Sequence, residues 1–163
     1  MLSYDKIYLV RHGSYNHSPQ ELTAKGRAES EAAGQRLLAG GVKEATLISS
    51  DEPRALQTSA IIASMIETAV VPSKRVNIIG NDPRGVKSLD EMLEVALSEA
   101  DVEATGESLV VVAHQPLLET AAFGARIANG EVVVYQPQTW QNPEFNTRNQ
   151  EYLHKKLGTA GLA

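Results

Sequence analysis

The sequence contains no cysteine. Disulfide bonds, thiolate zinc sites, iron–sulfur clusters and a cysteine nucleophile are therefore excluded, and a cytoplasmic location is expected rather than that of a small secreted scaffold. Long apolar runs are also missing near the N-terminus, where charged residues break a short apolar stretch within residues 1–13. That stretch is too brief for a signal peptide or a membrane span. We therefore expect no membrane partner.

Basic residues are fewer than acidic ones. The 15 Lys and Arg stand against 20 Asp and Glu, which gives a net charge of -5 over 163 residues. No long run of like charges occurs, so no nucleic acid partner is expected, because nonspecific binding of nucleic acid needs clustered Lys and Arg. The total charge still permits a few Arg to converge on one anion. With 42% apolar and 21% charged residues, the composition is that of a globular domain.

Short apolar and β-branched runs predict strands at residues 7–10, 45–48, 76–79, 109–113 and 132–135. Helices are predicted over residues 23–38, 53–66 and 89–100, and a fourth from Pro116. The alternation predicts an α/β fold: a single-domain, three-layer αβα sandwich with a mostly parallel sheet. Residues 1–135 form the predicted domain core. The polar segment 136–163, with a short helix over 148–157, is expected to be a lid, an interface or a tail.

Polar side chains follow three of the predicted strands. Arg11 and His12 follow the first strand, Arg54 comes shortly after the second, and His114 follows the fourth. Ligands of open parallel sheets bind at the carboxyl ends of the strands, so two Arg and two His are expected to meet at one edge. Arg matches phosphate oxygens with a planar fork of donors, and a neutral imidazole is a competent nucleophile. The pattern predicts transfer of a phosphoryl group.

Three sequence blocks carry a resemblance to a known family. Residues 9–13 read LVRHG and are followed at residues 22–26 by LTAKG, residues 49–58 read SSDEPRALQT, and residues 110–116 read VVVAHQP. In this order they resemble the histidine phosphatase superfamily, which has the phosphoglycerate mutase-like fold, from about residue 7 to about residue 125. The His-x-Pro form of the third block and the short chain are most similar to the small bacterial phosphohistidine phosphatases.

The resemblance implies that His12 is the nucleophile that becomes phosphohistidine, with Arg11, Arg54 and His114 completing the phosphate pocket. It implies no cofactor and no metal. His114 would donate to a phosphoryl oxygen, an interaction that strengthens as the transferring group gains charge. The implied activity is that of a phosphatase. The implied substrate is a phosphorylated protein histidine or, as the alternative, a small phosphorylated metabolite such as a sugar phosphate.

The sequence departs from the mutases of this family in two places. The acid that protonates the leaving group has no clean equivalent: Asp82 is the nearest acid to a strand end, and its Asn-Asp-Pro context is also a good turn sequence. Small phosphohistidine phosphatases also tend to lack this acid, which fits a phosphoramidate whose leaving nitrogen is protonated without one. Ser14 stands where an acidic residue often follows RHG, and Ser14 and Asn16 are predicted to contact the substrate.

Two rival interpretations belong to other classes. A metal site could use His12, His17 and His114, since imidazole is a common metal ligand. The adjacent Arg11 and Arg54 disfavour it, because they would repel a divalent cation. A phosphate-sensing or protein-binding module on the same fold would bind phosphate without turnover. A dinucleotide site is unsupported, because no Gly-x-Gly-x-x-Gly follows the first predicted strand.

Overall fold

The computed structural model describes residues 4, 6–77, 89–102, 108–115, 118 and 127–135. Its strands are β1 (Lys6–Arg11), β2 (Tyr15–His17), β3 (Gln20–Leu22), β4 (Glu44–Ser49), β5 (Glu67–Pro72), β6 (Ser108–Ala113) and β7 (Val132–Tyr135). Its helices are α1 (Ala24–Ala39), α2 (Pro53–Ala63), the short 3-10 helix η1 (Lys74–Val76) and α3 (Leu89–Glu99).

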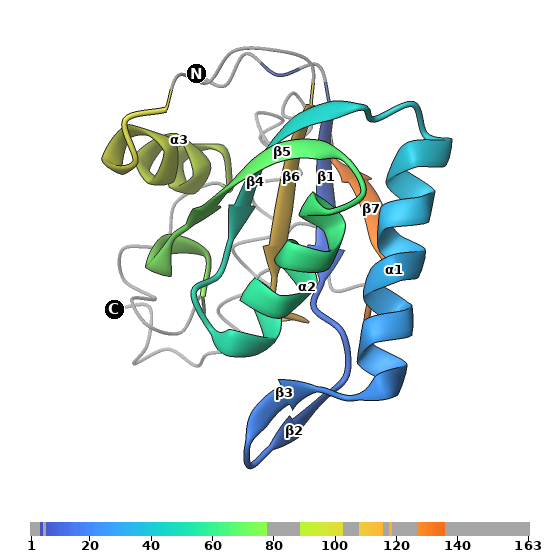
Figure 1. The fold of residues 1–163 in the computed structure, drawn as a ribbon. Coiled ribbons are helices and arrows are strands. Elements are labelled where there is room, and N and C mark those ends of the chain that lie inside the picture. Colours follow the sequence, from blue (N-terminus) through green and yellow to red (C-terminus); the bar gives the residue numbers. More distant parts are fainter. Residues whose placement is uncertain are drawn as a thin grey trace.

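The central sheet is mostly parallel, as predicted (Figure 1). Its five strands lie in the order β5-β4-β6-β1-β7. All neighbouring pairs are parallel except β1 and β7, which are antiparallel at one edge of the sheet. Strands β2 and β3 form a separate antiparallel hairpin beyond the carboxyl end of β1. This arrangement confirms the predicted α/β fold.

Alternate side chains of the buried strands contribute to two separate cores. On one face, β1, β4 and β6 pack against α3 through Ile7, Leu9, Ile48, Leu93, Ala96, Leu97, Leu109, Val111 and Ala113. On the other face, they pack against α1 and α2 through Tyr8, Val10, Ala33, Leu37, Leu47, Ala55, Ile62, Val110 and Val112. Because successive side chains of a strand point to opposite faces, a strand buried on both faces reads as a continuous apolar run. The three layers predicted from the sequence are therefore present.

Helices α1 and α3 have close to the predicted bounds. Thr23 is the N-cap of α1, and its side chain accepts a hydrogen bond from the Gly26 N–H at 3.0 Å. Gly40 is the C-cap, and Gly41 follows it with a φ of 87°, a conformation that favours glycine. Helix α3 buries Leu93, Ala96 and Leu97 in one core, and Met92 packs against them partly buried, a spacing that places all four on one face of the helix.

The prediction of a strand at residues 76–79 is wrong for residues 76 and 77, which are the two that the structure describes. Val76 lies in η1, and the strand that pairs with β4 is β5, nine residues earlier at its start. The preceding helix also ends earlier than predicted, at Ala63 rather than near Ile66. The β-branched run of residues 67–72 pairs with β4 directly after α2, whereas Val76 buries its side chain from a single helical turn that Ser73 caps.

Several predicted features lie outside the described residues. These are most of the fourth helix from Pro116, residues 78–79 of the third predicted strand, Asp82, and the segment 136–163 with its short helix. Where the fourth helix is expected to begin, the Leu118 N–H donates to the His114 carbonyl at 3.1 Å. None of the helices in the described part of the chain has both the length and the apolar character that a membrane span needs.

The loop after β1 packs against the first turn of α1 through two glycines. A Cβ at Gly13 would collide with the Gly26 carbonyl oxygen, and a Cβ at Gly26 would collide with the Ser14 carbonyl oxygen. The Thr23 N–H donates to the Ser14 carbonyl at 3.0 Å and ties the two segments together. The backbones meet too closely for a side chain to fit between them. This packing explains why the LVRHG and LTAKG blocks each need a glycine.

We expect the substitution Gly26→Ala to lower the free energy of unfolding by about 1–3 kcal/mol, because the added methyl group forces two backbone segments apart. Gly40→Ala is the matched control. Gly40 has a φ of -79°, which suits alanine, and its nearest atom to an added Cβ lies at 3.4 Å, so this variant should keep the parent's stability or gain slightly. Urea unfolding measures both. Equal losses in the two variants would contradict the tight glycine contact.

Candidate active site

The register of three parallel strands brings the predicted site residues together. Arg11 of β1 pairs with Ala113 of β6, so His12 and His114 follow side by side at the carboxyl end of the sheet. The His12 N–H donates to the Ala113 carbonyl at 3.2 Å, which extends the ladder by one residue. On the other side of β6, the Ser50 N–H donates to the Val112 carbonyl at 2.9 Å. The imidazole rings of His12 and His114 are 5.1 Å apart between centroids.

His12 is buried, with 5% of its surface exposed, and its ring is held by its own loop. Its Nδ1 lies 2.9 Å from the Gly13 carbonyl oxygen. A carbonyl oxygen only accepts, so this hydrogen bond requires the proton on Nδ1. In the neutral ring the lone pair is then on Nε2. The ring of His12 therefore carries its available lone pair on one defined nitrogen, Nε2.

The surroundings of His12 keep its ring neutral. Burial is the main cause that lowers the pKa of His12, from 6.5 to about 4, and the positive charges of Arg54 and Arg11 add to it. The hydrogen bond to the Gly13 carbonyl and the carboxylate of Glu29 act in the opposite direction. Near neutral pH the imidazole is therefore unprotonated at Nε2, which is the form that can attack phosphorus.

The two arginines approach the site from different elements. Arg11, at the end of β1, donates from Nη1 to the Ile127 carbonyl at 2.9 Å. Arg54, in the first turn of α2, has a side chain 15% exposed, and its guanidinium lies over the Tyr15 ring at 4.6 Å from the centroid. The Arg54 Nε is buried and donates to no described residue. A phosphoryl oxygen would satisfy such a donor.

Thr58 connects the His12 loop to helix α2. Its hydroxyl accepts from the Gly13 N–H at 3.0 Å and donates to the Arg54 carbonyl at 2.9 Å. From the other side, the Asn129 side chain donates to the His12 carbonyl at 3.0 Å. These bonds are made by the backbone around His12 and Arg54, so both side chains extend from a fixed main chain.

His114 is held by a buried hydroxyl. Its Nε2 lies 2.7 Å from Ser50 Oγ, and 4% of its surface is exposed. Burial, followed by the charges of Arg54, His12 and Arg11, lowers the pKa of His114 from 6.5 to about 3. Both imidazoles of the site are therefore neutral in the free protein. Positive charge in the site comes from the two guanidinium groups.

The remaining residues that the sequence analysis named are Ser14, Asn16, His17 and Asp82. Ser14 is half-buried, and its backbone N–H donates to Glu29 Oε1 at 2.8 Å. Asn16 and His17 are exposed in the β2–β3 hairpin, where Asn16 pairs with Glu21. That Ser14 and Asn16 contact substrate stays a prediction. Asp82, the predicted acid, lies outside the described residues.

Five residues close to the site were not singled out from the sequence: Tyr15, Ser50, Thr58, Asn77 and Asn129, whose side chain bonds the His12 carbonyl. Tyr15 contacts the rings of His12 and His17 edge to face, at centroid distances of 5.5 and 4.9 Å. Ser50 and Thr58 stand inside the SSDEPRALQT block, so the block itself was the signal for them. Asn77 lies in the segment that was wrongly predicted to be a strand. Its side chain was therefore not identified as a candidate for the site.

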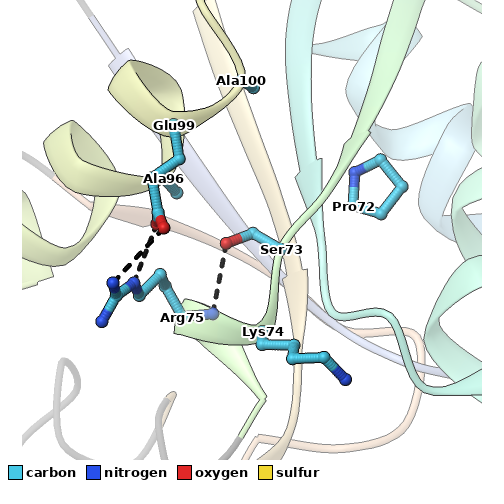
Figure 2. A pocket seen from close by; sticks show the side chains of 7 residues that line it. All are labelled: Pro72, Ser73, Lys74, Arg75, Ala96, Glu99 and Ala100. Atoms are coloured by element: carbon cyan, nitrogen blue, oxygen red, sulfur yellow. Dashed lines mark hydrogen bonds and ion pairs between the residues drawn. The ribbon is translucent and has the colours of Figure 1, made fainter.

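The described residues contain no group of three or more His, Cys, Asp or Glu side chains that could hold a metal ion. A groove elsewhere on the surface lies between η1 and α3 (Figure 2), and its lining residues are Pro72, Ser73, Lys74, Arg75, Ala96, Glu99 and Ala100. There the Arg75 guanidinium donates to the Glu99 carboxylate at 2.8 and 3.3 Å. None of the predicted site residues lines this groove.

Sequence comparison supports the family predicted from the three blocks. The chain matches the histidine phosphatase superfamily (branch 1) over residues 7–77, a stretch that contains the first two blocks. No curated protein matches the chain. The predicted resemblance to the histidine phosphatase superfamily is confirmed.

Solved structures share the fold. The protein histidine phosphatase SixA complexed with tungstate is 22% identical, with a TM-score of 0.52 over 69% of this chain and 71% of that chain. The putative phosphohistidine phosphatase SixA from Agrobacterium tumefaciens is 18% identical, with a TM-score of 0.59 over 82% of this chain and 91% of that chain. A phosphoserine phosphatase variant from Entamoeba histolytica in complex with phosphoserine is 15% identical, with a TM-score of 0.55 over 79% and 89%.

We expect the free energy of unfolding to fall as the pH is lowered from about 6.5 to about 4. The unfolded chain protonates His12 and His114 near pH 6.5, whereas their pKa values in the folded protein are about 4 and about 3. Over this window each histidine lowers stability by up to about 1.4 kcal/mol per pH unit, because only the unfolded state takes up the proton.

Urea unfolding between pH 7 and 4 measures this slope. The double variant His12→Asn with His114→Asn should show a shallower fall, while the exposed His17→Asn should follow the parent. The carboxylates contribute equally to all three proteins. A double variant with the parent's slope would mean that the two imidazoles are not held neutral.

Proposed function

We propose that the chain is a phosphatase that transfers a phosphoryl group to His12 and then to water. The observation that carries this proposal is the arrangement of His12: a neutral, buried imidazole whose Nδ1–H is bound to the Gly13 carbonyl, with Nε2 unprotonated beside two guanidinium groups. The match to the histidine phosphatase superfamily supports the same reaction.

In the first step, Nε2 of His12 attacks phosphorus. The Nε2–P bond forms as the bond from phosphorus to the leaving oxygen or nitrogen breaks, and the leaving group takes up a proton from solvent. In the second step, water attacks the phosphorus of phosphohistidine, the N–P bond breaks, and inorganic phosphate leaves with His12 neutral again. The Nδ1–H bond to Gly13 holds the ring in one tautomer through both steps.

Arg11, Arg54 and His114 complete the proposed phosphate pocket. Guanidinium groups fixed before the substrate arrives stabilise charge on the equatorial oxygens without reorganising during the reaction. The Arg54 Nε, which is buried and donates to no described residue, is an available donor for one of these oxygens. No metal or cofactor enters this scheme.

The proposed substrate is a phosphorylated protein histidine. A phosphoramidate has a leaving nitrogen that is protonated readily, so it needs no acid at the position where the sequence has no clean equivalent. Likeness in fold to the structures called SixA supports this choice. The second candidate is a small phosphate ester, which the likeness in fold to a phosphoserine phosphatase favours. In either case the proposed partner is a phosphorylated molecule.

We expect a covalent adduct on His12 when the protein is mixed with radiolabelled phosphoramidate and quenched rapidly at high pH. The adduct should be labile to acid, as N–P bonds are, and absent from His12→Ala. The exposed His17→Ala is the control and should retain the label. Binding of phosphate without any adduct on His12 would favour a binding module over an enzyme.

We expect Arg54→Ala to lower kcat/KM by about 10²–10³, the loss that follows removal of one preorganised transition-state donor. Its thermal unfolding should stay close to that of the parent, because the lost interaction acts on phosphoryl charge. Arg75→Ala is the matched control, since Arg75 pairs with Glu99 at the surface and should keep the parent's rate. Early unfolding of Arg54→Ala would instead assign Arg54 a structural role.

The substrate class is tested by steady-state comparison of a phosphohistidine protein with small phosphate esters. We expect the larger kcat/KM for the phosphohistidine protein, because its leaving nitrogen accepts a proton without a protein acid. The same comparison with His12→Ala gives the background of nonenzymatic hydrolysis. A clear preference for the esters would replace the first candidate by the second.

A further inference from the structure

A continuous chain of polar contacts runs from the protein surface to His114. Lys74 Nζ lies 3.0 Å from Asp51 Oδ2, and Asp51 Oδ1 accepts from Asn77 Nδ2 at 2.6 Å. Asn77 Oδ1 lies 2.6 Å from Ser50 Oγ, which in turn lies 2.7 Å from His114 Nε2. Ser50, Asn77 and His114 are buried, whereas Lys74 is exposed.

The orientation of the Asn77 amide follows from its partners. Asp51 is a carboxylate whose pKa is lowered by the Asn77 hydrogen bond and by Lys74, so its oxygens only accept and must face the Asn77 NH₂ group. The backbone N–H of Asp51 donates to the other amide atom at 3.1 Å, so that atom is the oxygen. The amide oxygen therefore also faces Ser50.

This orientation decides which way the remaining protons lie. The Asn77 amide oxygen only accepts, so the Ser50 hydroxyl donates its single proton to Asn77. Ser50 Oγ is then an acceptor, and the backbone N–H of Glu52 already donates to it at 3.2 Å. For the contact of 2.7 Å to be a hydrogen bond, His114 must donate from Nε2. The neutral ring of His114 then carries no proton on Nδ1.

We propose that Asn77 is a positioning residue that acts through Ser50 to fix His114 as its Nε2–H tautomer, leaving Nδ1 as the ring nitrogen that contacts a phosphoryl oxygen. The contact with phosphate rests on the proposed function, whereas the tautomer does not. Nδ1 donates to a phosphoryl oxygen once it takes up a proton, which comes from solvent or from a hydroxyl of the phosphoryl group. Ser50 keeps the proton on Nε2 in place while this happens.

A second ion pair on the same short helix supplies the control. Arg75 of η1 binds Glu99 of α3, and Figure 2 shows the Lys74 side chain directed away from that pair. In the described part of the chain, the side chains of the Arg75–Glu99 ion pair share no hydrogen bond or ion pair with Asp51, Asn77 or Ser50. Removing it disturbs the same surface while leaving the contacts to His114 in place.

The test is the tautomer of His114, read from long-range ¹⁵N–¹H correlation spectra of the labelled protein, with His114→Gln assigning the signals. The parent should show the Nε2–H form. In Asn77→Ala the Ser50 hydroxyl loses its acceptor and can donate to His114, so the Nδ1–H form should become substantially populated. Arg75→Met should have the parent's spectrum.

A paired exchange keeps the test decisive where Asn77→Ala fails to fold. Asn77→Asp combined with Asp51→Asn again places an acceptor toward Ser50 and an amide against a carboxylate, so the Nε2–H form should be restored. Under the proposed function, Asn77→Ala should lower kcat by roughly tenfold with a smaller change in KM, the lower end of the loss that follows removal of a partner that orients a metal-bound imidazole. The paired exchange should recover most of that loss.

An Nδ1–H tautomer in the parent, or an Nε2–H form unchanged in folded Asn77→Ala, would overturn the proposal. A parent that hydrolyses no phosphorylated substrate would overturn the proposed function but would leave the tautomer measurement valid. The two failures are therefore distinguishable.

Discussion

The parallel register of β4, β6 and β1 is the constraint on which the site depends. It pairs Arg11 with Ala113 and Ser49 with Val112, so the residues that follow each strand meet at one edge of the sheet. The same register assigns alternate side chains to two apolar cores. A slip by one residue would exchange the two faces of a strand and also separate His12 from His114. Core packing thus maintains the distances within the site.

The site can be buried in a stable protein because its two imidazoles are neutral and most of its other polar groups are hydrogen-bonded. Two imidazoles become neutral rather than ionise in an apolar environment, which limits the desolvation cost to that of a polar group. Thr58, Ser50 and Asn77 satisfy polar groups around them. The buried Nε of Arg54 donates to no described residue, although Nη1 of the same guanidinium lies 3.8 Å from Glu52 Oε2. An anion bound there would complete the arrangement.

The acidic total charge of -5 and the cationic site are consistent with each other. Net charge sums the whole surface, whereas Arg11 and Arg54 act over a few ångströms inside a largely buried centre. The lack of cysteine is likewise consistent with the site. Its absence rules out a thiolate nucleophile, and in the proposed reaction the neutral imidazole of His12 performs the equivalent covalent step.

Much of the fold could be predicted because a strand that is buried on both faces of the sheet has a continuous apolar sequence. The strand at 109–113 is a continuous apolar run, and α1 begins at a capping threonine. The strand β5 was missed because it lies at an edge, where a short β-branched run follows a helix without a separating turn signal.

The site residues likewise fall into those that the sequence could predict and those that it could not. His12, Arg11, Arg54 and His114 stand in sequence blocks, so their types and order were informative. Asn77 and Tyr15 act through contacts that depend on tertiary structure: a lone Asn after a valine and a Tyr in a hairpin carry no local signal. Their contributions follow from geometry, such as the 4.6 Å between the Arg54 guanidinium and the Tyr15 ring.

The central claim is that Nε2 of His12 is the nucleophile. A crystal structure with vanadate bound tests it most directly, because vanadium takes the geometry of phosphorus in the transition state. The account predicts a bond from vanadium to Nε2, oxygens held by Arg11 and Arg54, and Nδ1 still bound to the Gly13 carbonyl. Vanadate bonded to Nδ1, or bound away from the His12 ring, would contradict it.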